Sequence, residues 1–345
     1  MKVDREQLER LPKTDLHVHL DGSLRPETIL DLAGRDAVEL PFETVEDVRR
    51  FFFEDLPERD LVAYLERFDV TTAVMQTEDA LERIAFELVE DAARENVWYM
   101  EVRYAPILST KRGLSPRQVV DAIERGLRRG QRTHPRTRAH QIICGLRHFE
   151  PERAVRMAAL AVEYKDRGVL AFDLAGAEKD NPAKRFREAF YLVRHANLNV
   201  TVHAGEAYGP ESIHQALHWA GAHRIGHGVR LREDPDLMDY VCDHRIPLEM
   251  CPTSNVQTGA VPSIDRHPLR EYFERGLRVT VNTDNRLMSN TTVTDELALC
   301  CEHLDFDLPE LKKLVLNGFK SAFLRYAERK AMIGEAIAAL NEAGE

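Results

Sequence analysis

The feature that most constrains this sequence is a short strand-like segment that recurs eight times, each time followed by a helical pattern. Each segment is rich in β-branched or aromatic residues and ends in polar residues or glycine. The segments are residues 16–20, 100–105, 141–146, 169–175, 199–205, 224–228, 247–252 and 278–284. Repeated β/α units predict a parallel sheet covered by helices, and eight such strands close a barrel. We therefore expect the α/β class and a (β/α)₈ TIM barrel.

The stretches between these segments have the pattern of amphipathic helices. Examples are residues 79–95, 115–130, 152–167 and 234–244, several of which open on Ser-Pro or Asp-Pro, a helix cap followed by a first-turn proline. Residues 21–99 are too many for one crossover, so we expect a helical lid insertion after strand 1. The sequence pattern of residues 308–343 predicts C-terminal helices that wrap the barrel. Because no Gly/Ser linker interrupts the pattern, we expect a single domain over residues 1–345.

Composition narrows the class of ligand. Lys and Arg total 47 and Asp and Glu total 58, so 47 − 58 gives a net charge of −11, which disfavours nucleic acid and favours a small molecule. The first 15 residues hold no apolar leader and no later stretch is apolar enough to span a membrane, so we expect a cytoplasmic protein without a membrane partner. Five scattered cysteines without a CxxC pair predict reduced thiols. The oligomeric state cannot be predicted.

Candidate metal ligands lie near the ends of several predicted strands. His17 and His19 are one residue apart, so on a strand their imidazoles leave the same face. Such a pair alone also occurs as hydrogen-bonded core histidines. His203 ends strand 5 and Asp284 ends strand 8, and in this fold catalytic groups gather at the carboxyl ends of the strands. Barrel closure makes strands 1 and 8 neighbours, which would bring these four side chains together.

Nitrogen and oxygen ligands without a thiolate suit a catalytic zinc ion that makes hydroxide near neutral pH. Glu206 lies three residues after His203, and His227 ends strand 6, so both are acid–base candidates. The alternatives are a helix-starting carboxylate for Glu206 and a buried structural imidazole for His227. Their convergence on one rim of the barrel favours catalysis.

Other polar and aromatic positions allow more than one interpretation. Leu61, Tyr64, Leu65 and Phe68 form one apolar helical face, which either packs on the core or roofs a ligand pocket. Arg103 and Glu101 are expected to face opposite ways on strand 2, with Arg103 paired to a carboxylate. Ser254 and Asn255 either touch a substrate or cap a turn. The remaining histidines, His267 among them, are expected to be solvated or to support other residues.

Seven segments carry a resemblance that runs from about residue 11 to 325. They are LPKTDLHVHLDGSLRPETI, MEVRYAP, FDLAGAE, VTVHAGE, RIGHGVRL, LEMCPTSNVQTGAV and VNTDN. In this order they resemble the adenosine deaminases of the amidohydrolase superfamily. The resemblance implies a metal-dependent hydrolase with one Zn²⁺ per chain. The implied reaction is hydrolytic deamination of adenosine and 2′-deoxyadenosine to inosine and ammonia in purine metabolism.

Residue roles follow from the same resemblance. It implies that His17, His19, His203 and Asp284 bind zinc, that Glu206 gives a proton to purine N1, and that His227 orients the hydroxide and helps take up its proton. The implied substrate contacts are Asp21 to the ribose 5′-hydroxyl, the Gly176 N–H to purine N3, and Tyr64 and Phe68 in the apolar lid. Many family members have two aspartates where this chain has Asp284 and Asn285, so an amide replaces the carboxylate that approaches purine N7.

Two rival functions follow from the same residues. The first keeps the reaction on another 6-aminopurine, either adenine or a 5′-modified adenosine such as aminodeoxyfutalosine. The Asp21 position and the long insertion favour a ribosyl substrate over the free base. The second is a zinc-binding barrel without catalysis, a receptor or scaffold. A scaffold has no need for all six candidate metal and acid–base residues, which favours the enzyme.

Overall fold

A single sheet of eight parallel strands organises the chain in a computed structural model that describes residues 3–54 and 67–342. The strands follow one another around the sheet in sequence order, each hydrogen-bonded to the next. They are β1 (Lys13–His19), β2 (Val97–Tyr104), β3 (Arg138–Leu146), β4 (Val169–Ala175), β5 (Asn199–Ala204), β6 (Arg224–His227), β7 (Leu248–Met250) and β8 (Val279–Val281). The predicted strand count, order and parallel direction are confirmed.

Contacts between β1 and the end of β8 close the sheet into a barrel. Val18 and Asp284 form a parallel bridge. The His19 N–H donates to the Asp284 carbonyl at 2.7 Å, and the Asp284 N–H donates to the His17 carbonyl at 2.8 Å. These bonds complete a (β/α)₈ barrel, as predicted.

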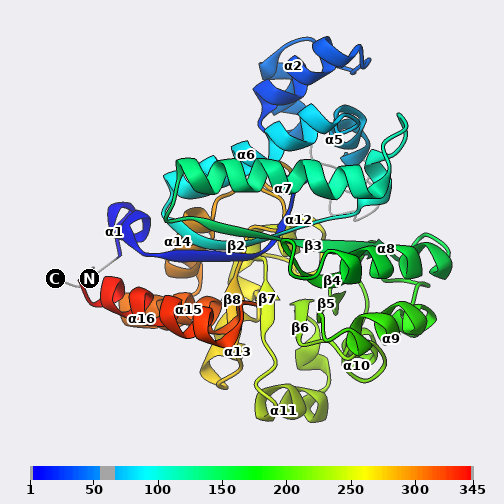
Figure 1. The fold of residues 1–345 in the computed structure, drawn as a ribbon. Coiled ribbons are helices and arrows are strands. Elements are labelled where there is room, and N and C mark those ends of the chain that lie inside the picture. Colours follow the sequence, from blue (N-terminus) through cyan, green and yellow to red (C-terminus); the bar gives the residue numbers. More distant parts are fainter. Residues whose placement is uncertain (1–2, 55–66, 343–345) are drawn as a thin grey trace.

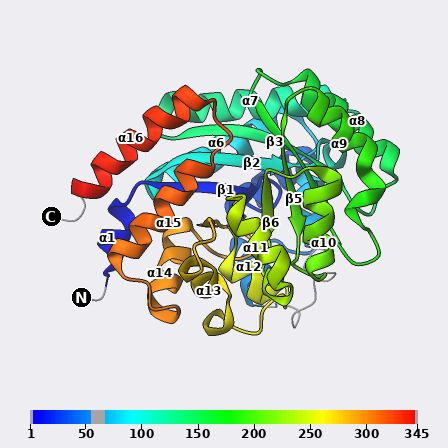
Figure 2. The same ribbon diagram turned by 90° about the horizontal axis from the view of Figure 1, so that it is seen from below.

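Helices cover the outside of this barrel (Figures 1 and 2). The α-helices are α1 (Arg5–Arg10), α2 (Pro26–Asp36), α3 (Val45–Arg49), α5 (Phe68–Val74), α6 (Glu78–Arg94), α7 (Pro116–Thr133), α8 (Pro151–Glu163), α9 (Arg187–His195), α10 (Pro210–Gln215), α11 (Pro235–Asp243), α12 (Pro252–Gln257), α13 (Leu269–Glu274), α14 (Val293–His303), α15 (Leu308–Ser321) and α16 (Tyr326–Glu342). The short 3₁₀ or π turns are η1 (Arg50–Glu54), η2 (Pro106–Ser109), η3 (Ala183–Phe186), η4 (Ala216–Ala220), η5 (Leu231–Glu233) and η6 (Ile264–Arg266). The predicted crossover helices therefore form, as do the C-terminal helices.

The segment between β1 and β2 is a helical insertion, as predicted. It contains α2, α3, η1 and α5 before the crossover helix α6. In Figure 1 the blue and cyan helices α2 and α5 stand beyond the strands at the top of the molecule. Phe68 begins α5, whereas Leu61, Tyr64 and Leu65 lie outside the described residues. The predicted apolar face is thus tested only at Phe68.

Charged side chains fill part of the barrel interior. Arg103 donates to Asp173 at 3.0 Å and to Glu249 at 2.8 Å, and Arg224 donates to both Glu249 and Glu101. All five side chains are buried. The expected carboxylate partner of Arg103 is confirmed. The expectation that Arg103 and Glu101 face opposite ways is wrong, because residues two apart on a strand leave the same face.

Two further expectations concern the thiols and the membrane. All five cysteines are free, and Cys144, Cys251 and Cys300 are buried. Within residues 3–54 and 67–342, no helix combines the length and apolar character that crossing a bilayer requires.

Candidate metal centre and catalytic pocket

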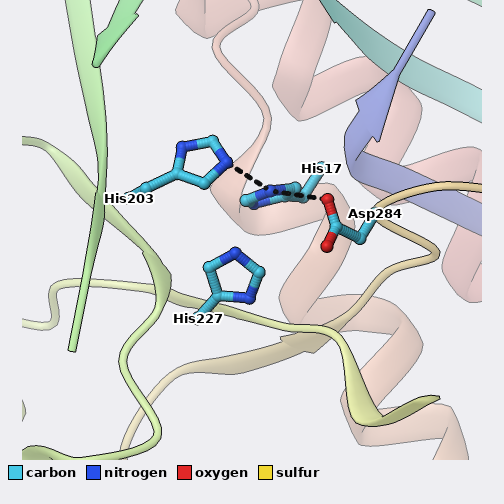
Figure 3. Close-up of side chains that lie close together, drawn as sticks. All are labelled: His17, His203, His227 and Asp284. Atoms are coloured by element: carbon cyan, nitrogen blue, oxygen red, sulfur yellow. Dashed lines mark hydrogen bonds and ion pairs between the residues drawn. The ribbon is translucent and has the colours of Figure 1, made fainter. Parts of the chain in front are cut away.

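Four predicted ligand side chains converge at the carboxyl ends of three strands. His17 and His19 come from β1, His203 from β5, and Asp284 follows β8. The His203 Nε2 atom lies 3.1 Å from the Nε2 atoms of both His17 and His19, and the Asp284 Oδ1 atom lies 3.4 Å from the same two nitrogens. Figure 3 shows His17, His203 and Asp284 pointing toward one another. Residues far apart in sequence thus form one buried cluster.

The spacing of these donor atoms fits a tetrahedral metal ion. Ligand bonds of about 2.0–2.1 Å place the corners of a tetrahedron about 3.3–3.4 Å apart. The measured separations of 3.1 and 3.4 Å are close to that edge length. Three imidazoles and one carboxylate suit zinc or a similar divalent ion. The donor set therefore fits the predicted cofactor in number, type and spacing.

Two buried carboxylates orient the ligand imidazoles from behind. The Nδ1 atom of His17 lies 2.8 Å from Glu249, and the Nδ1 atom of His203 lies 3.0 Å from Asp173. A carboxylate on the far ring nitrogen is characteristic of metal-binding histidine, because it leaves the Nε2 lone pair free for the ion. The fourth side chain, Asp284, is also held from behind, because the Ser254 hydroxyl donates to its Oδ2 atom at 2.6 Å.

These supporting residues were missed or left open by the sequence patterns. Glu249 and Asp173 are acidic residues inside otherwise apolar strands, and that contrast is the signal that could have identified them. The sequence allows Ser254 either to touch a substrate or to cap a turn. In the structure its hydroxyl donates to the Asp284 carboxylate. Asn255 contacts the His227 imidazole at 3.0 Å.

Two residues of the site have a left-handed backbone conformation. His227 has φ of 63° and Asp284 has φ of 58°, in the left-handed region that costs an ordinary residue about 1–3 kcal/mol. At Asp284 the cost is offset by backbone hydrogen bonds on both sides of the residue to β1. In this conformation the Asp284 carboxylate lies 3.4 Å from the Nε2 atoms of His17 and His19.

The two acid–base candidates face each other beside the cluster. The Nε2 atom of His227 lies 3.6 Å from the Oε2 atom of Glu206, and Thr258 donates to the Oε1 atom of Glu206 at 3.0 Å. Burial raises the pKa of Glu206 above its ordinary value, although His227 opposes the change. A raised pKa favours the neutral acid, which can donate a proton.

Glu178 fixes the turn that carries Glu206. Its carboxylate accepts from the backbone N–H groups of Gly205, Glu206 and Tyr208 at 2.8, 3.0 and 2.9 Å, and from the Ser212 hydroxyl at 2.6 Å. Glu178 is buried. A buried carboxylate with four donors holds the turn firmly, and no sequence pattern pointed to it.

Three of the predicted substrate-side residues lie around the same hollow, whereas Asp21 is not among its lining residues. Phe68, Gly176 and Asn285 line a pocket together with His19, His203, Glu206, His227 and Asp284. The Oδ1 atoms of Asp21 and Asn285 are buried without a hydrogen-bond partner among the described residues. Burial raises the pKa of Asp21 to about 7. Unpaired buried polar atoms beside a pocket are suited to a polar ligand.

A second grouping of donor atoms has to be distinguished from the first. The ligand atoms of His17, His203, His227 and Asp284 lie within 4.8 Å of one another, so His227 stands there in place of His19. The set that includes His19 has the closer match to tetrahedral edges, since its four measured separations span only 3.1–3.4 Å. Either way, a buried group of histidine and aspartate side chains can hold a metal ion at this point.

Comparison with known proteins agrees with the geometry. The family model described as adenosine deaminase matches residues 12–339. An adenosine deaminase of Mycobacterium avium is 42% identical over 97% of this chain and 96% of its own length. The crystal structure of adenine deaminase from Arthrobacter aurescens superposes with a TM-score of 0.90 at 29% identity, covering 96% of this chain and 99% of the other. An Arabidopsis N6-mAMP deaminase has a TM-score of 0.86 at 28% identity, covering 96% and 99%. This chain belongs to the adenosine deaminase family.

Proposed function

We propose that this protein is a zinc-dependent enzyme that hydrolyses adenosine and 2′-deoxyadenosine to the corresponding inosines and ammonia. The observation that carries the proposal is the set of His17, His19, His203 and Asp284, whose measured donor-atom separations are 3.1–3.4 Å, beside the buried Glu206. The named relatives support adenosine as substrate, since those more than 40% identical are adenosine deaminases. The ligand is thus a small-molecule nucleoside.

We assign one Zn²⁺ per chain to these four ligands. When bound, zinc supplies a Lewis acid that makes a water molecule a better nucleophile near neutral pH. The Glu249 and Asp173 carboxylates keep the His17 and His203 rings in one orientation, and Ser254 does the same for the Asp284 carboxylate. These contacts fix the orientation of three of the four assigned ligands.

Glu206 is assigned as the acid that protonates purine N1. Addition of water at C6 pushes an electron pair onto N1, so a proton must be available there. Burial keeps Glu206 in its neutral form to a higher pH than an exposed glutamate. Thr258 donates to its Oε1 atom, which leaves the Oε2 side to face His227 and the reacting atoms. The carboxyl group thus has one free oxygen toward the purine.

The substrate contacts are assigned to the residues around the hollow. The Gly176 N–H would meet purine N3, Asn285 would meet N7, and Asp21 would meet the 5′-hydroxyl. The unpaired oxygen of Asp21 supports this assignment, because the 5′-hydroxyl of a bound nucleoside can donate to it. At Asn285 the contact with N7 would be made by the Nδ2 group, because N7 only accepts. Tyr64 and Phe68 would cover the purine, and of these two only Phe68 lies in the described residues.

A substrate panel tests the proposal against deamination of adenine or of 5′-modified adenosines. Adenosine and 2′-deoxyadenosine should have the highest kcat/KM among adenosine, 2′-deoxyadenosine, adenine, AMP and 5′-deoxyadenosine. Asp21→Ala should lower kcat/KM for adenosine by about 10- to 100-fold and have little effect on adenine, because only the nucleoside carries the hydroxyl. A parent enzyme that prefers adenine or AMP contradicts the proposal.

A further inference from the structure

A chain of three buried side chains runs from the outside of the site to His227. It consists of His267, Asn255 and His227, all at most 4% exposed, so water does not replace the contacts between them. Each contact has a donor and an acceptor, and the first donor is a backbone N–H whose direction is fixed. The position of every proton along the chain can therefore be derived.

The first contact sets the protonation of His267. The Leu269 N–H donates to the Nδ1 atom of His267 at 3.2 Å. This nitrogen must carry a lone pair, so the single proton of the neutral ring is on Nε2. Burial lowers the pKa of His267 to about 3, which keeps the ring neutral.

The second contact sets the orientation of the Asn255 amide. The Nε2 atom of His267 lies 3.1 Å from the Asn255 Oδ1 atom, so its N–H donates to that oxygen. The opposite orientation would place the Asn255 NH₂ group against the His267 N–H, donor against donor. The Asn255 NH₂ group therefore points toward His227.

The third contact sets the proton on His227. The Asn255 Nδ2 atom lies 3.0 Å from the Nδ1 atom of His227 and can only donate. The Nδ1 atom must accept, so the proton of the neutral His227 ring is on Nε2. That N–H lies on the side of Glu206, whose Oε2 atom is 3.6 Å away.

We propose that Asn255 and His267 are positioning residues that fix His227 as the Nε2–H form, so that His227 offers a hydrogen-bond donor to the reacting atoms. The catalytic meaning of this arrangement rests on the proposed function, whereas the proton positions do not. His227 is the reverse of His17 and His203, whose Nδ1 atoms face carboxylates and leave Nε2 free for a metal. His227 is therefore not a metal ligand.

This assignment changes the role that family resemblance implies for His227. The nitrogen that faces the site already holds a proton, so it cannot take up another one from water. It can hold the incoming oxygen by donating to it. The proton that water releases can pass to Glu206 once Glu206 has given its own proton to N1, and the Oε2 atom of Glu206 lies 3.6 Å from the Nε2 atom of His227.

The proton positions can be measured directly with ¹⁵N-labelled histidine. Long-range ¹H–¹⁵N correlation at neutral pH distinguishes the two neutral forms of an imidazole from its cation. The signals of His227 and His267 are assigned by their loss in His227→Gln and His267→Gln. We expect protonated Nε2 and unprotonated Nδ1 in both rings, with or without zinc. A His227 ring protonated at Nδ1, or at both nitrogens, overturns the proposal.

Two substitutions at one position separate positioning from packing. Asn255→Asp keeps the volume but replaces the donor with an acceptor, which favours a proton on the Nδ1 atom of His227. Asn255→Ala removes the group without favouring the wrong form. We expect kcat to fall by about 100-fold in Asn255→Asp and by about 10-fold in Asn255→Ala, with metal content unchanged in both.

A purely structural role predicts the opposite order, because alanine leaves a cavity and aspartate does not. An Asn255→Ala variant that is slower than Asn255→Asp therefore contradicts the proposal, as does parent-like kcat in both. If one variant fails to fold, the labelled parent enzyme still decides the proton positions. A parent that deaminates another 6-aminopurine refutes the proposed substrate only, since the same variants can be compared on that purine.

Discussion

Glu206 shows how one residue depends on several neighbours. Its pKa is raised by burial, one carboxyl oxygen accepts from Thr258, and its backbone N–H is bound by Glu178. These three influences have separate effects. Burial favours the protonated carboxyl group, the Thr258 hydrogen bond occupies the Oε1 atom, and the Glu178 hydrogen bond holds the main chain. The same residue type on an open turn would be ionised and mobile.

Replacing Glu206 by glutamine tests its role as the acid. Glu206→Gln keeps the shape and the contact with Thr258 but has no proton of suitable acidity for N1. We expect kcat to fall by about 100-fold or more, with the metal content and the free energy of unfolding close to those of the parent. Steady-state rates on adenosine measure kcat, elemental analysis measures the metal content, and urea unfolding measures the free energy of unfolding. Turnover at near the parent rate would exclude Glu206 as the proton donor.

Sequence patterns identified the residues that meet at the centre but not those behind them. His17, His203 and Asp284 could be predicted because strand ends gather at one rim of a barrel. Glu249, Asp173 and Glu178 act by contacts across the barrel or between loops, and such pairings depend on register and on loop path. For Glu249 and Asp173 the local sign is a single acidic residue in an apolar strand, and Glu178 lies in the loop after β4 and lacks even that sign.

At the scale of elements, the turn from His203 to Tyr208 connects strand β5 to Glu206. The Glu178 carboxylate accepts from three backbone N–H groups of this turn. Arg147 donates to the His203 carbonyl at 2.6 Å. Gly205 has φ of 71°, and a Cβ atom there would lie 2.4 Å from Ile213, so only glycine fits this bend. The turn thus depends both on Gly205 in its own sequence and on contacts with Glu178 and Arg147 outside it.

Loosening this turn should affect catalysis through Glu206 alone. In Glu178→Gln an NH₂ group must face at least one backbone N–H, so we expect kcat to fall by about 10-fold with KM little changed. In a Glu206→Gln background the same substitution should change kcat by less than about twofold. Ser212→Ala is the control, because it leaves the three backbone contacts intact. Equal losses in both backgrounds would show a general structural effect.

Glu296 on α14 gives the fold a pH dependence of known sign. Its buried carboxylate accepts from the Thr253 N–H at 3.1 Å and from the Thr291 hydroxyl at 2.7 Å. Burial raises its pKa from 4.5 to about 7. Between these values the folded state keeps a proton that the unfolded state has lost. The contribution of Glu296 to stability therefore falls as pH rises from about 4.5 to about 7 and is constant above that.

Glu296→Gln should remove that dependence. The amide can accept from the Thr253 N–H and donate to the Thr291 hydroxyl, which itself lies 3.3 Å from the Thr292 carbonyl. From pH 5 to pH 8 the variant should gain up to about 3 kcal/mol relative to the parent. Urea unfolding at the two pH values measures this, with exposed Glu302→Gln on the same helix as control. A relative stability that does not change with pH would contradict the assigned sign.

At the scale of the whole molecule, closure of the barrel creates the site. His17 and Asp284 are 284 − 17 = 267 positions apart in sequence, yet their backbones are hydrogen-bonded. The count and order of strands could be predicted because β/α repetition is a local pattern. The short lengths of β7 and β8 could not be predicted, since the polar residues that follow these strands belong to the site. Long-range pairing decides those ends.

The most direct test of the account is to remove the metal and restore it while adenosine turnover is measured. Stripped protein should lose nearly all activity, and added Zn²⁺ should restore it in proportion to occupancy up to one ion per chain. His203→Ala should not be restored at the same zinc concentration. Full adenosine deamination by stripped protein, or none by protein with one zinc per chain, would contradict the central claim.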